Sequence, residues 1–385
     1  MGAQARAVIP FSRPYRAAAT LERLKFVVES DHAHGDGPFT AAASAKLRAL
    51  TGGDVLLTTS GTHALEMASR LVDLGPGDEV VLPTFTFSSA AAAVAMTGAS
   101  IVFIDVEGPS GNLDVSQVAD AVGPNTRAIS VMHYGGQPVD MSAVMSIAAE
   151  RGLAVIEDNA HGLGVMSEYG PLGRIGDVGV QSFHDTKNVH AGEGGALLVN
   201  RERDLLRAEV MREKGTNRSE FLRGEVDKYS WVDWGSSYLP SEYCAAVLDA
   251  QLDAFDQIQS HRHRTWERYA EGLAEWAGRV GVELMEPAGG IHAAHLFYLL
   301  VPDWNDQSDL IRTLRAADVV AAFHYVPLDS SLAGRRFGRS LHPLARAEDL
   351  SHRLVRLPLW AGMTDDEIDR VIDAVTRWTP TKENR

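Results

Sequence analysis

The alternation of two kinds of segment between Val55 and Asn200 constrains the fold of this 385-residue chain more than any other feature. Short β-branched or apolar runs alternate there with segments of helical periodicity, which is typical of a mostly parallel sheet covered by helices. The sequence therefore predicts an α/β fold. The predicted strands are Val55–Leu57, Glu79–Leu82, Ile101–Ile104, Ala128–Met132, Ala154–Ile156, Val178–Phe183 and Ala196–Val199. The predicted helices are Thr62–Leu74, Ser88–Thr97, Val115–Val122, Ser142–Glu150 and Arg203–Glu213.

The length of the chain predicts a large domain, residues 1–250, and a smaller α+β domain, residues 251–385. A long helical pattern from Glu242 to about Trp276 predicts the bridge between them. The small domain is predicted from apolar runs at Phe297–Val301 and Val319–Phe323 and from helical patterns at Ser308–Ala317 and Asp365–Trp378. The polar segment from Arg212 to Tyr238 has no clear period, and a stretch of that kind is usually functional or mobile.

The charge balance and the cysteine content exclude several classes of protein. The chain has 36 Lys and Arg against 51 Asp and Glu, a formal net charge of −15, which argues against a nucleic-acid partner. Cys244 is the one cysteine, so no internal disulfide can form. The apolar run Ser89–Met96 is far shorter than the roughly 20 residues that cross a bilayer. No secretory signal precedes the first predicted strand, and we expect a cytoplasmic protein with no membrane segment.

A lysine follows the end of one predicted strand and precedes a glycine-rich turn. Residues 182–187 read Ser-Phe-His-Asp-Thr-Lys, and residues 191–195 read Ala-Gly-Glu-Gly-Gly. Ligands bind at the carboxyl ends of the strands in open α/β sheets, which makes Lys187 a candidate catalytic residue. A solvated surface lysine beside an ordinary turn is the alternative, and the local pattern alone favours that alternative.

Two carboxylates, Glu157 and Asp158, follow another predicted strand. Such an acid can cap a helix or bind a metal ion. It can also hold the proton on the pyridine nitrogen of pyridoxal 5′-phosphate (PLP), which makes the ring an electron sink. A PLP site would combine this carboxylate with a lysine, a ring-stacking group and an anion cradle, and we expect no metal ion in it.

The remaining two parts of such a site are present in the expected order. Residues 58–63 read Thr-Thr-Ser-Gly-Thr-His and run from a strand into a helix, where free amides hold phosphate. An ordinary helix cap is the alternative. Residues 83–88 read Pro-Thr-Phe-Thr-Phe-Ser and end the next strand with two aromatic side chains. An aromatic at such a position more often belongs to the core than to a cofactor platform. Four modest signals at successive strand ends indicate a PLP site together.

Longer segments carry a resemblance to a known family. Gly35-Asp36-Gly37 with Phe39-Thr40, Pro-Gly-Asp-Glu-Val at 76–80 and Phe-His-Asp-Thr-Lys-Asn at 183–188 contribute to it. The most specific match is Arg-Glu-Lys-Gly-Thr-Asn-Arg-Ser at 212–219, continuing through Arg-Gly at 223–224 and Val-Asp-Lys-Tyr at 226–229 to Gly-Ser-Ser-Tyr at 235–238. From end to end the chain resembles the DegT/StrS family of sugar aminotransferases, within it most closely the dTDP-4-amino-4,6-dideoxygalactose transaminase group.

The resemblance implies a homodimeric PLP-dependent transferase of fold type I, with site residues carried over position by position. Lys187 would carry the cofactor as a Schiff base, Asp158 would pair with the pyridine nitrogen, and His161 would lie near the ring hydroxyl. Phe87 would lie against the ring face. Gly61, Thr62 and Ser182 would hold the phosphate. Relatives add an Asn from the neighbouring subunit, where this chain has Ser237, and commonly place a His where this chain has Asp329, to which we assign no role.

The implied reaction moves the amino group of L-glutamate to a nucleotide-linked 4-keto-6-deoxy sugar. Lys187 would hold the cofactor and then move a proton. The substrate-binding candidates are Lys214, Arg218 and Lys228, whose alternative is a solvated charge run, together with Tyr325. Rival interpretations are a sugar dehydratase, which in this family replaces the lysine by His, a non-catalytic nucleotide-sugar-binding protein, and an aminotransferase acting at C3 or on a cyclitol. The stereochemistry of the product at C4 does not follow from the residues.

Overall fold

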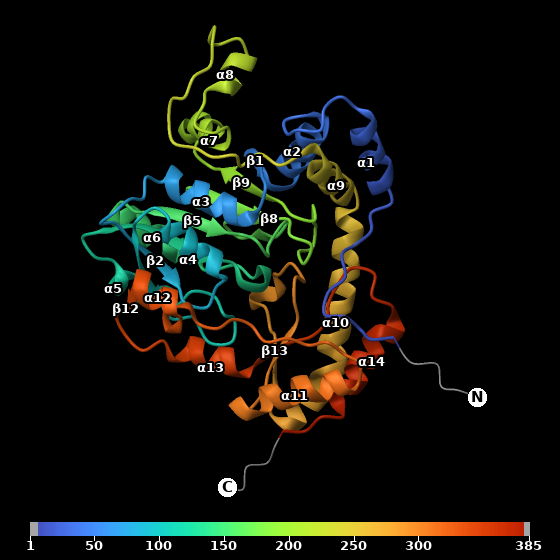
Figure 1. Cartoon of the computed structure of the whole chain (residues 1–385). Coiled ribbons are helices and arrows are strands. Elements are labelled where there is room, and N and C mark those ends of the chain that lie inside the picture. The colour runs from blue at the N-terminus through green and yellow to red at the C-terminus, as the bar shows by residue number, and fades with distance from the viewer. Residues whose placement is uncertain (1–6, 381–385) are drawn as a thin grey trace.

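A central mixed sheet organises the computed structural model, which describes residues 7–380 (Figure 1). Its eight strands lie in the order β1-β9-β8-β5-β4-β2-β3-β12. Neighbouring strands are parallel except at β9, which pairs antiparallel with both β1 and β8. The strands are β1 Asp54–Thr58, β2 Glu79–Pro83, β3 Ser100–Ile104, β4 Thr126–Met132, β5 Ala154–Asp158, β8 Val178–Ser182, β9 Gly195–Val199 and β12 Gly338–Ser340. The predicted α/β fold class and each strand predicted between Val55 and Asn200 are confirmed.

Helices cover both faces of this sheet. Val55 and Leu57 of β1 pack with α2 and α9, whereas Leu56 between them packs with α3 on the opposite face, as the alternation of side chains along a strand requires. Both faces are apolar because both are buried. The helices of this part are α1 Thr20–Glu29, α2 Pro38–Thr51, α3 Gly61–Leu71, α4 Ser88–Ala95, α5 Val118–Ala121, α6 Met141–Arg151, α7 Leu205–Arg212, α8 Arg218–Leu222 and α9 Glu242–Asp253. A two-stranded ribbon, β6 Met166–Ser167 and β7 Gly170–Pro171, accompanies them.

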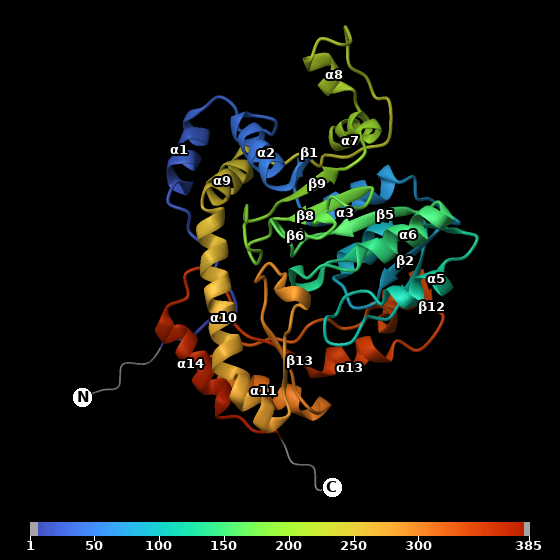
Figure 2. The ribbon, with the colours of Figure 1, turned by 180° about the vertical axis from the view of Figure 1, so that it is seen from behind.

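A second, smaller part of the molecule is built on the three-stranded antiparallel sheet β10-β11-β13. The helices α10, α11 and α14 share one apolar core with it, which includes Tyr269, Phe297 and Trp360. Figure 2 shows α10 running from the end of α9 to this second part. The elements of this part are α10 Phe255–Val280, β10 Glu283–Leu284, β11 Tyr298–Leu300, α11 Trp304–Ala316, α13 Ala345–Arg353, β13 Leu354–Arg356 and α14 Asp365–Thr376. The helix α12 Leu332–Phe337 lies beside β12 and β3 at the edge of the large sheet.

Two segments cross between the parts. Ile9, near the start of the chain, forms a parallel bridge with Val319, and β12 pairs with β3 at the edge of the large sheet. The predicted domain boundary at residue 250 stays a prediction. Ile9 and β12 would each lie on one side of this boundary and pair with a segment on the other side.

Two sequence patterns correspond to less regular structure than one continuous helix or strand. The helical pattern from Glu242 to Trp276 is two helices, separated at Ala254, after which Phe255 packs so closely on Gly164 that a Cβ there would lie 2.4 Å from the ring. The apolar run Val319–Phe323 is not a regular strand, because it makes only isolated bridges to Ile9 and Arg356.

The segment at residues 35–40 has a clear structural role. The carboxylate of Glu242, at the start of α9, is fully buried and accepts hydrogen bonds from the amides of Gly37, Phe39 and Thr40 at 3.1, 2.7 and 3.0 Å. These amides begin α2, so the carboxylate satisfies a helix N-terminus that has no capping side chain of its own. A Cβ at Gly37 would collide with this carboxylate at 2.6 Å, which explains the glycine.

Candidate active site

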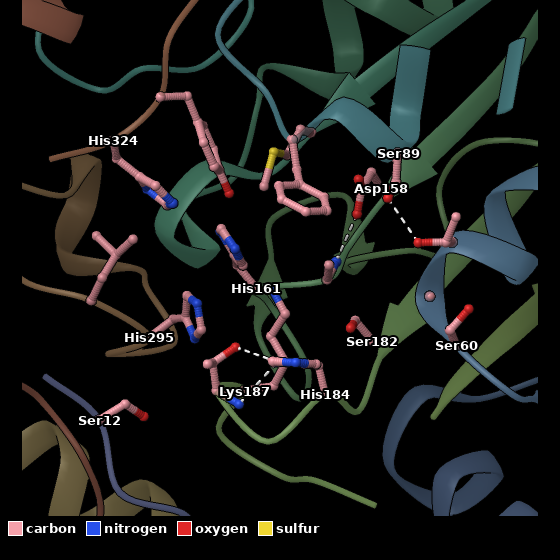
Figure 3. Close-up of a pocket in the computed structure, with 18 of the residues that line it drawn as sticks. Ser12, Ser60, Ser89, Asp158, His161, Ser182, His184, Lys187, His295 and His324 are labelled. Atoms are coloured by element: carbon pink, nitrogen blue, oxygen red, sulfur yellow. Dashed lines mark hydrogen bonds between the residues drawn. The ribbon is translucent and has the colours of Figure 1, made fainter. Parts of the chain in front are cut away.

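A pocket of about 490 Å³ lies beyond the carboxyl ends of the central strands. Its walls come from the ends of β5 and β8, the first turns of α3 and α4, and three segments of the outer layers around residues 11–12, 295–296 and 324–325, together with β13. This is the place where open α/β sheets bind their ligands. Figure 3 shows Lys187 and Asp158 near its centre.

The loop after β8 carries Lys187 into the pocket. The amide of Lys187 donates to the carbonyl of His184 at 2.9 Å. At the base of the loop, the amide of Phe183 donates to the carbonyl of Gly194 and the amide of Ala191 donates to the carbonyl of Phe183, both at 2.8 Å. Burial lowers the pKa of Lys187 to about 8; Asp158 opposes this shift and Arg356 adds to it. A lysine with such a pKa has a substantial neutral fraction at physiological pH, which is the form that attacks an aldehyde.

Asp158 is the last residue of β5 and is 3% exposed. Its Oδ1 accepts a hydrogen bond from the amide of Ala160 at 3.0 Å. Burial raises the pKa of Asp158, while the Ala160 amide, Lys187 and His133 act in the opposite direction. The neighbouring Glu157 points the other way: it bonds to His133 at 3.0 Å and to the amides of Gly173 and Ile175, and holds the turn after β7 in place. Of the two carboxylates, only Asp158 lines the pocket.

The first turn of α3 provides an anion cradle. Ser60 caps the helix by accepting from the amide of His63 at 3.1 Å, and its carbonyl accepts from the amide of Ala64. The amides of Gly61 and Thr62 belong to this first turn, and both residues line the pocket beside Ser182. A Cβ at Gly61 would lie 2.9 Å from the side chain of Ser182, so the glycine keeps the cradle open. Free amides at a helix N-terminus bind phosphate.

The two aromatic residues after β2 have different roles. Phe85 is fully buried and packs on Tyr134, so it belongs to the core. Phe87 is 54% exposed, lines the pocket and lies 6.2 Å from the ring of Tyr325, which also lines it. The structure therefore selects Phe87 as the candidate platform for a flat ligand.

Three histidines, His161, His295 and His324, form the side of the pocket opposite the cradle, as Figure 3 shows. His161 stacks on His295 with ring centroids 4.1 Å apart. Burial holds the pKa of each far below its ordinary value, so all three are neutral at physiological pH. Because Nδ1 of His161 accepts from the amide of Gly135 at 3.2 Å, its proton is on Nε2. The Nε2–H group of His161 is therefore the donor that this side chain can offer to a hydroxyl on the ring of a ligand.

Some residues around the pocket were not predicted. His295 and His324 have no strand-end motif around them, and Phe11, Ser12 and Arg356 come from the two ends of the chain. Only the folding of the terminal segments onto the sheet brings them to Lys187. Of this wall, only Tyr325, the neighbour of His324 in the segment 323–329, was predicted from the sequence. Asp329 in the same segment lies outside the pocket and bonds to the hydroxyl of Thr84.

The other predicted residues do not line the pocket of this chain. Ser237 lies at a bridge to Glu213, and Arg218 pairs with that same glutamate at 3.4 Å. Lys214 and Lys228 are exposed. All four belong to the segment after α7 that projects away from the sheet with α8 (Figure 1). Within one chain, the structure separates them from Lys187.

These features define a class of protein: an α/β protein with a lysine, a carboxylate and an anion cradle around one pocket. A family model, the DegT/DnrJ/EryC1/StrS aminotransferase family, matches residues 14–376. The chain therefore belongs to this family, whose members act on sugars linked to nucleotides, and PLP is its cofactor.

Individual relatives support this family assignment. The UDP-N-acetyl-3-dehydro-alpha-D-glucosamine 3-aminotransferase of Acidithiobacillus ferrooxidans is 30% identical over 323 residues, 83% of this chain and 82% of that protein. The crystal structure of the aminotransferase TlmJ from Streptoalloteichus hindustanus has a TM-score of 0.88 at 28% identity, covering 96% of this chain and 98% of that one. DesI, solved in the presence of its TDP-sugar product, has a TM-score of 0.86 at 28% identity, covering 97% and 93%.

The residues of the pocket fit PLP. A helix N-terminus kept clear by Gly61 suits its phosphate, the buried Asp158 suits a protonated ring nitrogen, and Lys187 suits its aldehyde. Within residues 7–380, no group of His, Cys, Asp and Glu is arranged to hold a metal ion. In the same range, no helix combines the length and the apolar character of a membrane span.

Proposed function

We propose that the protein transfers the amino group of L-glutamate to dTDP-4-dehydro-6-deoxy-D-glucose and produces the dTDP-4-amino-4,6-dideoxy sugar in the cytoplasm. The observation that carries this proposal is the meeting of Lys187, Asp158 and the first turn of α3 in one pocket. The likeness to DesI, whose crystal structure was determined in the presence of its TDP-sugar product, supports the nucleotide. The resemblance of residues 212–238 to the dTDP-4-amino-4,6-dideoxygalactose transaminase group supports a product with the galacto configuration.

Each residue has a distinct part in this proposal. Bound PLP supplies an electron sink that stabilises negative charge on the carbon that loses a proton. Lys187 would hold the cofactor through its amine, and the same amine, once free, would accept the proton that the reacting carbon loses and return a proton. Asp158 keeps the ring nitrogen protonated. The remaining contacts come from Phe87 on the ring face, His161 at the ring hydroxyl, and Gly61, Thr62 and Ser182 at the phosphate.

The rival functions differ in what they require of these residues. A dehydratase of this family would have His in place of Lys187, and a non-catalytic binding protein would have no need of the lysine and Asp158 together. Transfer at C3 has one observation in its favour, because a relative of 30% identity is named as a 3-aminotransferase.

A panel of keto-sugars tests the substrate. We expect amination of dTDP-4-dehydro-6-deoxy-D-glucose with L-glutamate, and a much smaller kcat/KM for UDP-linked and dTDP-linked 3-keto sugars and for keto-cyclitols, because each displaces the reacting carbon from the lysine. Product NMR identifies the aminated carbon and its configuration. Preferential amination at C3 would contradict the proposed substrate and leave the aminotransferase class intact.

We also propose a homodimer in which residues 212–238 complete the site of the neighbouring subunit. This segment projects from the molecule and exposes the large apolar side chains Trp231 (79%) and Leu222 (62%), which suits burial against a partner. It also presents Lys214, Arg218 and Lys228, three cations suited to a nucleotide diphosphate, and Ser237 near the phosphate.

Mixed dimers test this arrangement. Lys187→Ala and the double variant Arg218→Ala/Lys228→Ala should each be nearly inactive alone. After joint refolding, about a quarter of the wild-type activity should return, since roughly half of the dimers are hybrids with one complete site. Tags of two kinds measure how many hybrids form. Abundant hybrids without activity would mean that the basic residues do not serve the neighbouring site.

A further inference from the structure

His295 has one ring nitrogen bonded to the protein and one that is not. Its Nδ1 lies 2.9 Å from Oδ1 of Asn188, the residue that follows Lys187. Within residues 7–380, no group forms a hydrogen bond with Nε2, and the ring lines the pocket (Figure 3). What Nε2 can bind depends on which nitrogen carries the proton, and the surroundings of Asn188 decide this.

The side-chain amide of Asn188 has one orientation that satisfies its neighbours. Its Nδ2 donates to Oε1 of Gln259 and to the carbonyl of Ala293, both at 2.8 Å. These two bonds use both hydrogens, so Oδ1 is the acceptor that faces His295, and His295 donates from Nδ1. Burial holds the pKa of His295 far below its ordinary value, so the ring is neutral. The Nε2 atom is therefore a hydrogen-bond acceptor.

The stacked ring of His161 has the opposite polarity. Its Nδ1 accepts from the amide of Gly135 at 3.2 Å, so its Nε2 donates. The rings of His161 and His295 lie 4.1 Å apart with an angle of 25° between their planes. This wall thus offers a donor and an acceptor side by side. In the proposed function the donor serves the ring hydroxyl of PLP, and the acceptor needs a ligand group that carries a hydrogen.

The backbone that carries His295 is strained and is held from the long helix α10. Ala294 has a φ of 45°, a conformation that costs free energy for a residue with a Cβ. The buried Arg262 of α10 donates from Nε to the carbonyl of Ala294 at 2.9 Å and from Nη2 to the carbonyl of His295. Strain that the surrounding structure maintains is concentrated at functional sites, which indicates that a ligand depends on the position of this ring.

The two substrates of the proposed reaction differ in what they can donate. The carboxylates of L-glutamate are acceptors only, and its amino group is the group that reacts. A 4-keto-6-deoxy sugar carries hydroxyls at C2 and C3, and the C3 hydroxyl is adjacent to the keto carbon. Since the keto carbon must reach Lys187, the C3 hydroxyl lies nearest to the side chains around that lysine. His295 is one of them, since the charge of Lys187 contributes to its lowered pKa.

We propose that Nε2 of His295 accepts a hydrogen bond from the C3 hydroxyl of the nucleotide-linked keto sugar, and thereby selects sugars with a hydroxyl next to the reacting carbon. This assignment rests on the proposed function. Asn188 is a positioning residue, because it fixes the proton of His295 on Nδ1. L-Glutamate makes no use of Nε2, so only the half-reaction with the sugar depends on His295.

His295→Phe tests the assignment in the PLP-loaded enzyme, with each half-reaction followed separately by the absorbance of the cofactor. The kcat/KM for dTDP-4-dehydro-6-deoxy-D-glucose should fall about 10–100-fold, because an enclosed hydroxyl loses its acceptor, and the rate with L-glutamate alone should change less than about threefold. A sugar with hydrogen in place of the C3 hydroxyl should be about 10–100-fold poorer for the wild type, whereas for His295→Phe the two sugars should differ less than about threefold. His295→Gln retains an acceptor and should recover part of the loss.

His352→Phe is the matched control. His352 also stacks on an aromatic ring at 4.1 Å, that of Trp304, but it does not line the pocket. Both half-reactions of this variant should stay within about twofold of the wild type. Binding gives a readout without turnover, because dTDP-6-deoxy-D-glucose has a hydroxyl in place of the keto group and cannot be aminated. Calorimetry should give a Kd about 10-fold or more higher for His295→Phe than for the wild type and for His352→Phe.

Three outcomes would overturn the assignment. The first is an equal kcat/KM of the wild type for the sugars with and without the C3 hydroxyl. The second is a loss in His295→Phe that is the same for both sugars, and the third is an equal loss in both half-reactions, which would mean that His295 serves Lys187 or the cofactor. If His295→Phe does not fold, the comparison of the two sugars in the wild type and in His295→Gln decides. Failure of the wild type to aminate any nucleotide-linked keto sugar, while L-glutamate still reacts, would refute the proposed function itself and is distinguishable from these results.

Discussion

Lys187→Ala should lose turnover by roughly 10⁴-fold or more, because the same amine anchors the cofactor and moves the proton. Borohydride treatment of the wild type should fix PLP to the peptide that contains Lys187, and peptide mass spectrometry locates it. The depressed pKa of Lys187, about 8, favours this lysine over surface lysines such as Lys25. The unchanged cradle should still bind the cofactor without a covalent link.

Lys25→Ala is the control, since this lysine lies on the exposed face of α1 and pairs with Glu29 at 3.7 Å. Turnover should stay within about twofold of the wild type. Labelling of a different lysine by borohydride, or near-normal turnover of Lys187→Ala, would refute the role of Lys187.

Asp158→Asn should keep the fold and reduce turnover by about 10²–10³-fold. An amide has the shape of the carboxylate but no negative charge, so it supports a protonated ring nitrogen poorly. Steady-state kcat and the visible absorbance of the bound cofactor measure the effect. Because Lys187 and Asp158 influence each other's pKa, the absorbance of the variant should also titrate at a different pH.

Asp177→Asn is a matched control: Asp177 directly precedes β8 and contacts the start of β5, the strand that Asp158 ends. Its carboxylate accepts from the amide of Val155 at 2.7 Å, so this substitution should cost stability and spare kcat. If Asp158→Asn turned over at a near-normal rate, the carboxylate would be structural, as Glu157 is.

The sequence predicted the central sheet well because its strands are short, apolar and separated by turns. The runs at Val55–Leu57 and Ala196–Val199 are buried on both faces, so the local pattern and the final environment agree. The helices α1 and α2 were not predicted. The interior of α2 is rich in alanine, and the anchor of its N-terminus is Glu242, more than 200 positions away, which no local pattern contains.

The candidate site was predicted mainly where it is built from strand ends. Lys187, Asp158 and Gly61 lie at strand ends or within a few residues of them, and their order along the chain indicates a common edge. The opposite wall depends on long-range folding: Phe11 and Arg356 meet because the N-terminal segment packs beside β13 and Val319. A single arginine in a short apolar run gives no sign that it faces a pocket until its neighbours are known.

The fate of the amino nitrogen tests the central claim most directly. L-Glutamate labelled with heavy nitrogen is incubated with the PLP-loaded enzyme and dTDP-4-dehydro-6-deoxy-D-glucose, and the nucleotide sugar is analysed by mass spectrometry and NMR. The account predicts that the label appears on C4 of the sugar in the wild type and that no labelled sugar forms with Lys187→Ala. An unlabelled sugar in the presence of cofactor-loaded wild-type enzyme, or label transfer that persists without Lys187, would contradict it.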